Sequence, residues 1–357
     1  MNAEQSYALL ISNKYIEENK MRITSLIKSV GTVALALPIA FFAAAMPSAH
    51  AADQVNLRLG WVTTDSPDDP YGIGAVEFKS QVEKMSEGKV TVELYPNRQL
   101  GDEKELIEGV RFGTVDLALV VNAVIANVEP SFQILDMPFL FSNSTQAAEV
   151  LDGEVGEMLA EKLKKKGIIV LGYHEGGFRS MLNNIRPVVN PEDVDGVKYR
   201  VMQNPVYVSM FQALGGNAIP MAWGETFTAM QQGTIGGLEM PVPVAYTGKY
   251  NEVAKYLSLT RHTYSVTSLL MSERSMKKLT PELQEVILKA AKVSTYNQRK
   301  MATALNQEVL EELEAEGMLI NEISDVSAFR EKVQPVYEKF RKTIGDEIMD
   351  AALNEVQ

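Results

Sequence analysis

The sequence contains no cysteine and few of the residues that build common catalytic centres. Without cysteine the chain cannot form a disulfide, a thiolate nucleophile, or a thiolate-bound zinc or iron–sulfur cluster. Of its 3 histidines, only His174 and His262 lie beyond residue 51. The motifs H-E-x-x-H and G-x-S-x-G and the Walker loop are missing, so metalloprotease, α/β-hydrolase and P-loop chemistry lack their required groups. We therefore expect neither a metal nor another cofactor.

Basic residues are also fewer than acidic ones. The chain has 34 Lys and Arg against 46 Asp and Glu, which gives a formal net charge of -12. This balance argues against nucleic acids and anionic membrane surfaces as general partners. With 46% hydrophobic and 22% charged residues, the composition is that of a globular protein and excludes disordered, collagen-like and coiled-coil classes. A chain of 357 residues is long enough for two domains.

Only one long apolar run is present, and it has the features of a secretory signal. The run covers Val30–Met46, follows the basic residues Arg22 and Lys28, and is followed by the small-residue site Ala49-His50-Ala51. A basic region, a short apolar core and an A-x-A exit are typical of a cleavable signal peptide. An uncleaved membrane anchor is the alternative.

We therefore predict that residues 1–51 are an N-terminal extension and signal peptide. Translation is expected to start at Met21 and cleavage to occur before Ala52. The removed part carries four basic and three acidic residues, so the mature protein would have a net charge of −12 − 1 = −13. An exported, acidic, cysteine-free protein is expected in the bacterial periplasm.

Beyond residue 51 the pattern predicts an α/β fold. Apolar runs of strand length alternate with segments of helical periodicity, which indicates largely parallel sheets covered on both faces. The helical segments are 73–86, 103–112 and 145–165. The predicted strands are Val55–Val62, Lys89–Tyr95, Val115–Val121, Gly167–Tyr173, Val197–Val201 and Tyr256–Leu259.

Two helix starts are well marked. Asp102 is a candidate N-cap, and Glu105 three residues later is placed to complete a capping box. Thr280-Pro281 opens a helix that meets no breaker before Gly317. That helix would be roughly 54 Å long at 1.5 Å per residue. Because this exceeds the diameter of one domain, we expect the helix to lie across two.

The centre of the chain carries the chemically most informative residues. Residues 176–243 are rich in Gly, Asn, Pro and Met, and Arg200 lies inside an apolar strand. A buried arginine requires an anionic partner. That partner is either an internal carboxylate such as Glu225 or Glu239, or a carboxylate ligand held by the guanidinium fork. The residues alone leave both alternatives open.

Five blocks of the sequence, in this order, resemble the DctP family of solute-binding proteins that serve tripartite ATP-independent periplasmic (TRAP) transporters. The likeness covers essentially all of residues 52–357 and is greatest to the branch that carries sugar acids. The blocks are LYPNRQLGDEKELIEGVRFGTVDL, ILDMPFLF, GFRSMLNNIRPVVNPEDVDGVKYRV, IPMAWGETFTAMQQGTIGGLEMP and KYLSLTRHTYS.

This resemblance implies roles for individual residues. Arg200, in the block G-x-K-x-R-V, matches the family's essential carboxylate-binding arginine. Arg179, in the G-x-R block, matches a second arginine that often reaches the ligand. Glu103, after Q-L-G-D, matches an acidic residue that could accept from sugar hydroxyls, although a carboxylate is favoured there by the helix start as well. Met240 stands where the family often has an asparagine that donates to the ligand carboxylate.

Further ligand-binding candidates are weaker. Trp223 is expected either to stack on a sugar face or to pack in the core. Asn122 follows a predicted strand and would face the cleft if that strand ends at residue 121. Tyr71, Glu175 and Glu239 complete the candidate site.

The resemblance further implies a two-lobed, Venus-flytrap α/β protein with mixed sheets, whose long helix spans both lobes. The predicted lobes are residues 52–176 with 266–305, and residues 177–265 with 306–357. The expected function is capture of a uronate- or aldonate-like carboxylate and its delivery to the membrane permease of the transporter, by a monomer without enzymatic activity. A C4-dicarboxylate or keto-acid carrier is the first alternative, and a periplasmic enzyme is the second.

Overall fold

A computed structural model describes residues 54–356 of the chain. The predicted N-terminal extension and signal peptide, residues 1–51, lie outside the described residues. The chain separates by its internal contacts into residues 1–50 and 51–357, and every described residue belongs to the second unit. Within residues 54–356, none of the helices combines the length and the apolar character needed to cross a membrane.

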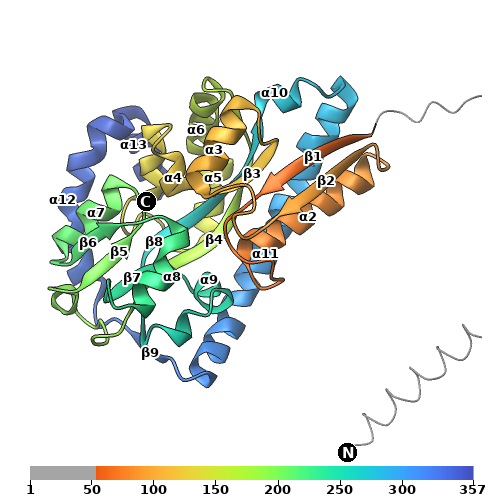
Figure 1. The fold of residues 1–357 in the computed structure, drawn as a ribbon. Helices are drawn as coiled ribbons and strands as arrows, with labels where there is room; N and C mark the ends of the chain where they lie inside the picture. Colours follow the sequence, from red (N-terminus) through yellow and green to blue (C-terminus); the bar gives the residue numbers. More distant parts are fainter. Residues whose placement is uncertain (1–53, 357) are drawn as a thin grey trace, which may run out of the picture. The chain divides into compact units, whose positions relative to one another are not determined.

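The second unit is built around one mixed sheet (Figure 1). Its spatial order is β2-β1-β3-β8-β4-β7-β5-β6, and β9 pairs with β8. We call β2, β1 and β3 the first wing of the sheet, and β7, β5 and β6 the second wing. The strands are β1 (Val55–Gly60), β2 (Val90–Tyr95), β3 (Leu117–Val121), β4 (Ile168–Asn183), β5 (Lys198–Val201), β6 (Asn217–Pro220), β7 (Gly237–Pro241), β8 (Tyr256–Ser272) and β9 (Leu319–Glu322).

The two central strands, β4 and β8, join the wings into a continuous sheet. They pair antiparallel over most of their length, whereas the strands inside each wing are parallel. The parallel pairing predicted from the alternating pattern is therefore right inside the wings and wrong for the central strands. β4 and β8 are 16 and 17 residues long, whereas the apolar runs predicted short strands at these places. Both strands are longer because Gly, Ser and Thr continue them where the apolar pattern stops. Register shifts in β4, one of them between Glu175 and Gly177, let these long strands bend.

Alternate residues of each buried strand feed two cores, one on each face of the sheet. In β3, Leu117 and Leu119 pack in one core, and Ala118 and Val120 pack in the other. Burial on both faces explains the continuous apolar runs of the sequence. The helices that cover the faces are α2 (Pro70–Met85), α3 (Glu103–Phe112), α4 (Asn122–Ile125), α5 (Ser144–Asp152), α6 (Glu154–Lys164), α7 (Pro205–Ala213), α8 (Trp223–Gln231), α9 (Val242–Thr247), α10 (Glu273–Met276), α11 (Pro281–Ala315), α12 (Val326–Ile344) and α13 (Asp346–Glu355), with short 3-10 turns η1 (Pro130–Asp136), η2 (Pro191–Val194) and η3 (Tyr250–Glu252).

Helix starts follow the sequence signals with two differences. Thr280 caps α11 through the backbone N–H of Leu283, and the helix runs for 35 residues and packs against α2, α9 and β4. The single helix expected over 145–165 is two helices, because the chain is extended at Gly153. Asp102 caps α3, and its carboxylate accepts from the backbone N–H of Glu103. A capping box would require a hydrogen bond from the N–H of Glu105 instead, so the predicted box is not formed.

Candidate functional site

A small buried cavity lies where several strands of both wings end. It has a volume of about 20 Å³. Its lining comes from the carboxyl ends of β1, β3, β5 and β7, from the first turns of α2, α3, α8 and α9, and from the central strands β4 and β8. The carboxyl ends of parallel strands are where α/β proteins bind ligands. The lining residues are Val62, Thr63, Tyr71, Glu103, Val121, Arg179, Arg200, Met202, Trp223, Met240, Pro241, Val244 and Ser265.

A larger outer pocket of about 400 Å³ adjoins this inner cavity. The two spaces share four lining residues, Glu103, Arg200, Met202 and Trp223. Elsewhere the outer pocket is lined mainly by polar and charged side chains, whereas the inner cavity is mostly apolar. The remaining residues of the outer pocket are Arg98, Asp102, Lys104, Glu105, Val124, Gln203, Met221, Ala222, Gly224 and Glu225.

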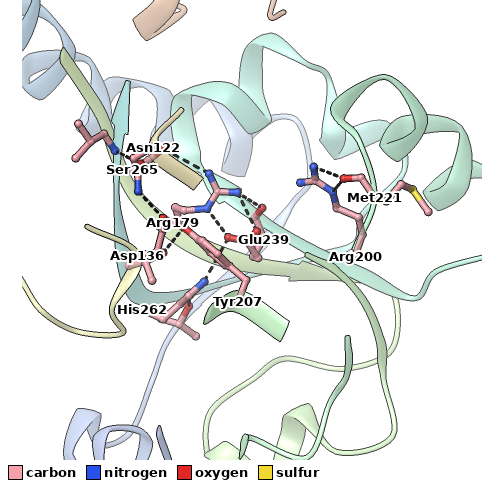
Figure 2. Close-up of polar contacts among 12 residues, drawn as sticks. Asn122, Asp136, Arg179, Arg200, Tyr207, Met221, Glu239, His262 and Ser265 are labelled. Atoms are coloured by element: carbon pink, nitrogen blue, oxygen red, sulfur yellow. Dashed lines mark hydrogen bonds and ion pairs between the residues drawn. The ribbon is translucent and has the colours of Figure 1, made fainter. Parts of the chain in front are cut away.

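Arg200 is held at the boundary of the two spaces by a backbone carbonyl. Its side chain is buried, and its Nε and Nη2 donate to the carbonyl oxygen of Met221 at 3.0 and 2.8 Å (Figure 2). Nη1 has no hydrogen-bond partner within residues 54–356, and no carboxylate of that range forms an ion pair with this guanidinium. Burial lowers the pKa of Arg200, yet an arginine stays protonated at neutral pH. The cationic Nη1 amino group, with its two N–H donors, is thus left for another partner.

Arg179, by contrast, is paired inside the protein. Its Nε donates to the carboxylate of Glu239, and its Nη2 donates to Glu239 Oε1 at 2.9 Å and to the Glu239 carbonyl oxygen at 2.8 Å. The internal salt bridge considered for Arg200 is therefore made by Arg179 (Figure 2). Nη1 of Arg179 reaches the hydroxyl of Ser265 at 3.5 Å, on the side that lines the inner cavity.

Buried aromatic and imidazole groups surround this ion pair. The guanidinium carbon of Arg179 lies 5.5 Å from the ring centre of Tyr207, and Nε2 of His262 lies 3.5 Å from Glu239 Oε2. Burial is the largest single influence on the pKa of Glu239 and raises it, but the charge and hydrogen bonds of Arg179, together with the contact to His262, hold that pKa below its ordinary value. Burial lowers the pKa of His262, so this imidazole is neutral at pH 7. The charges of Arg179 and Glu239 therefore cancel each other within the protein.

Glu103 is the acidic group of the cavity. It is the first residue of α3, and its Oε1 accepts a hydrogen bond from the backbone N–H of Val121 at 3.1 Å. Burial raises the pKa of Glu103 to about 7, although that hydrogen bond opposes the change. Near neutral pH this carboxyl group is therefore protonated in a substantial fraction of molecules and can both donate and accept.

Six of the nine candidate residues line the inner cavity together: Arg200, Arg179, Glu103, Trp223, Met240 and Tyr71. Tyr71 and Met240 are buried. The ring of Trp223 is half-buried and lies 5.8 Å from that of Tyr250. Trp223 can therefore pack against the core and stack on a ligand at the same time.

The other three candidates do not line either space. The predicted strand does end at residue 121, but the amide of Asn122 donates to Asp136, and its oxygen accepts from the N–H of Val266 at 3.0 Å. Glu175 accepts from the hydroxyl of Thr303 at 2.6 Å, and Glu239 is bound to Arg179. Each of these side chains is therefore already bonded to another residue of the protein.

Sequence reasoning missed several lining residues. Thr63 and Ser265 line the inner cavity, and Arg98 lines the outer pocket. Arg98 stands directly before the block Q-L-G-D, and this position could have indicated it. Thr63 and Ser265 carry no such signal, because hydroxyl residues are frequent in both segments.

Comparison with known proteins places this geometry in a family. Residues 61–343 match the family model described as bacterial extracellular solute-binding protein, family 7 (DctP). The 2,3-diketo-L-gulonate-binding periplasmic protein YiaO of Escherichia coli (strain K12) is 33% identical over 91% of this chain and 99% of its own.

Two solved structures share the fold. The sugar acid binding protein DctPAm of Advenella mimigardefordensis, in complex with galactonate, has a TM-score of 0.82 and 37% identity over 84% of this chain and 97% of its own. A TRAP periplasmic solute-binding protein of Polaromonas sp. JS666, bound to D-erythronate, has a TM-score of 0.81 and 37% identity over 84% and 98%. The predicted α/β, two-lobed fold class and the resemblance are confirmed. The chain belongs to family 7 of the bacterial extracellular solute-binding proteins, the DctP family.

Proposed function

We propose that this protein captures a uronate- or aldonate-like sugar acid in the periplasm and delivers it to the membrane permease of a TRAP transporter. The observation that carries the proposal is the buried guanidinium of Arg200, whose Nη1 amino group has no partner in residues 54–356 and which lies beside a cavity. A carboxylate is the partner that such a group favours most, because both charge and geometry match.

Capture requires the two wings to separate and close again. The inner cavity of about 20 Å³ holds about one water molecule, so a six-carbon acid cannot enter it as it stands. Tyr71 and Glu103 lie in α2 and α3, which connect the strands of the first wing. Arg200 and Met240 lie in β5 and β7 of the second wing, and Trp223 begins α8, which connects β6 to β7. A ligand that touches both sets stabilises closure through its higher affinity for the closed state. The predicted division into lobes, 52–176 with 266–305 and 177–265 with 306–357, is part of this proposal.

Closure also strengthens the bonds to the ligand. When water leaves, a charge-assisted hydrogen bond from Arg200 acts in a medium of lower dielectric constant. Thr63, Ser265 and Glu103 offer hydroxyl and carboxyl groups to the hydroxyls of a sugar acid, and the indole of Trp223 offers an apolar face. Because Glu103 is partly protonated at neutral pH, it repels the ligand carboxylate less than an ionised group would.

The relatives support the nature of the ligand and the role. One is named for diketogulonate, and two solved neighbours hold galactonate and erythronate. We propose that the protein acts as a monomeric carrier, without catalysis.

A ligand panel tests the proposal. Residues 52–357 are titrated calorimetrically with galactonate, glucuronate, galacturonate, erythronate and C4-dicarboxylates, and the bound compound is recovered and checked by mass spectrometry. We expect an aldonate or uronate to bind best and to be recovered unchanged. Arg200→Lys should bind at least tenfold more weakly, because an ammonium group cannot bind the Met221 carbonyl through two N–H groups and present a third donor to the ligand in the same fixed plane. Binding of dicarboxylates alone, chemical conversion of the ligand, or wild-type affinity in Arg200→Lys would each contradict the proposal.

A further inference from the structure

Asp102 forms hydrogen bonds to the starts of two helices that lie on opposite sides of the outer pocket. Its Oδ1 accepts from the backbone N–H of Glu103 at 2.9 Å, and its Oδ2 accepts from the backbone N–H of Gly224 at 3.2 Å. Helix α3, which begins at Glu103, precedes β3 of the first wing, and α8, which contains Gly224, precedes β7 of the second wing. The carboxylate therefore joins the two wings across the pocket.

Helix α8 lacks a cap of its own. Its N-cap position is occupied by Ala222, whose backbone is extended (φ -64, ψ 155) but whose side chain cannot accept a hydrogen bond. The first N–H groups of a helix have no partner inside it. A carboxylate at this place satisfies one of them and interacts favourably with the helix dipole. Asp102 supplies to α8, from the other wing, what an N-cap residue normally supplies from within the same segment.

The contact depends on the absence of a side chain at Gly224. A Cβ built there would overlap the guanidinium of Arg98 and lie 3.2 Å from Asp102 Oδ2. A glycine in the first turn of a helix weakens that helix relative to alanine. The close approach of Arg98 and Asp102 is a physical reason for its presence.

The segment that Asp102 holds also positions the ligand-binding groups. The carbonyl of Met221 accepts both hydrogen bonds from Arg200, and Trp223 lines both spaces. Both residues lie within three positions of Gly224. A bond at Gly224 therefore restrains the backbone that orients Arg200 and Trp223.

We propose that Asp102 is a positioning residue for ligand capture: it caps α8 from the opposite wing only when the wings are closed, and so favours the closed state and slows ligand release. This inference rests on the proposed function, because it assumes that closure traps the ligand. It concerns the contact between the wings and not a contact with the ligand.

Asp102→Asn is the decisive variant. Asparagine caps a helix about as well as aspartate, so α3 keeps its cap, but the single amide oxygen replaces only one of the two carboxylate oxygens. We expect ligand release, followed by stopped-flow tryptophan fluorescence in a Trp61→Phe background so that Trp223 alone reports it, to be about fivefold faster, which corresponds to the loss of one helix cap. Loss of a negative charge near an anionic ligand would by itself slow release, so faster release identifies the lost bond.

Asp325→Asn is the matched control. Asp325 caps α12 through the N–H of Ser327 at 2.8 Å, so the same chemical change is made at a helix that does not contact the pocket. Release from this variant should equal that of the wild type. Wild-type release from Asp102→Asn, or equal acceleration in both variants, would overturn the proposal.

A second measurement does not need a ligand. Because the chain has no cysteine, spin labels can be attached through Arg111→Cys at the end of α3 and Gln231→Cys at the end of α8, both exposed positions. In the unliganded protein, Asp102→Asn should shift the label distances toward longer values than in the wild type or Asp325→Asn. If no acid binds the wild type, the proposed function fails, and this distance shift still decides whether Asp102 favours closure. Unchanged distances would refute that role.

Discussion

The two buried arginines of the site should respond in opposite ways to the same substitution. We consider Arg200→Met and Arg179→Met, in which an apolar chain of similar length replaces each guanidinium. Both arginines are buried, and they differ in whether a carboxylate neutralises them. Arg179 is paired with Glu239, whereas Arg200, among the described residues 54–356, hydrogen-bonds only to the carbonyl of Met221.

The magnitudes follow from that difference. Arg179→Met leaves the carboxylate of Glu239 buried without a cation, and the neutral His262 beside it cannot replace the charge. Breaking a buried pair in this way costs about 3–5 kcal/mol. Arg200→Met removes two hydrogen bonds to one carbonyl, which costs about 1 kcal/mol, and it also removes the cost of burying a charge without a counterion. We therefore expect its unfolding free energy to stay within about 1 kcal/mol of the wild type or to exceed it.

Urea unfolding of residues 52–357 without ligand, and calorimetry with the best ligand of the panel, separate these effects. Arg200→Met should retain its stability and lose at least a hundredfold in affinity, since truncating one partner of a buried, hydrogen-bonded charge pair costs about 2–5 kcal/mol and a hundredfold corresponds to about 2.8 kcal/mol. Arg179→Met should lose stability even without ligand. Destabilisation by about 3 kcal/mol or more in Arg200→Met would refute the reasoning, because it would mean that an internal anion depends on Arg200.

Two further predictions concern a titrating carboxyl group and a close contact in the core. Burial raises the pKa of Glu103 from 4.5 to about 7, so the folded state binds the proton more tightly, and this contribution to stability is lost as the pH rises from 4.5 to 7. Relative to Glu103→Gln, the wild type should therefore lose up to about 3 kcal/mol between pH 4.5 and pH 8 in urea unfolding; parallel pH profiles of the two proteins would contradict this. In Gly74→Ala, the new Cβ would overlap Nδ1 of His174 and lie 2.8 Å from its Cε1, and we expect a loss of about 1–3 kcal/mol. The same loss measured in a His174→Ala background would show that this overlap is not the cause.

Much of the fold was readable from local pattern. The helix over 103–112 begins and ends as its periodicity predicts, and Thr280 starts a helix of 35 residues. These features depend on residues close together in the chain, namely caps and apolar spacing. The full length of β4 and β8 was not readable, because Gly, Ser and Thr continue these strands only where a partner strand holds them.

The candidate site also has features that the sequence predicted and features that only the structure shows. An arginine inside an apolar strand already indicated that Arg200 needs an anion, and the matching sequence blocks indicated the family. Which arginine receives the internal carboxylate depends on strand register. In the pairing of β5 with β7, Arg200 stands opposite Leu238, and in the pairing of β4 with β7, Arg179 stands opposite Pro241.

Successive residues of a strand point to opposite faces of the sheet. Glu239 therefore shares a face with Pro241 and with Arg179, whereas Arg200 shares a face with Leu238 and Met240. This register joins segments about sixty residues apart, so no local pattern contains it. The amino-acid order was enough to identify the family and to indicate that a buried arginine needs an anion, and only the packed sheet decided that Glu239 pairs with Arg179 and that Nη1 of Arg200 has no partner among residues 54–356.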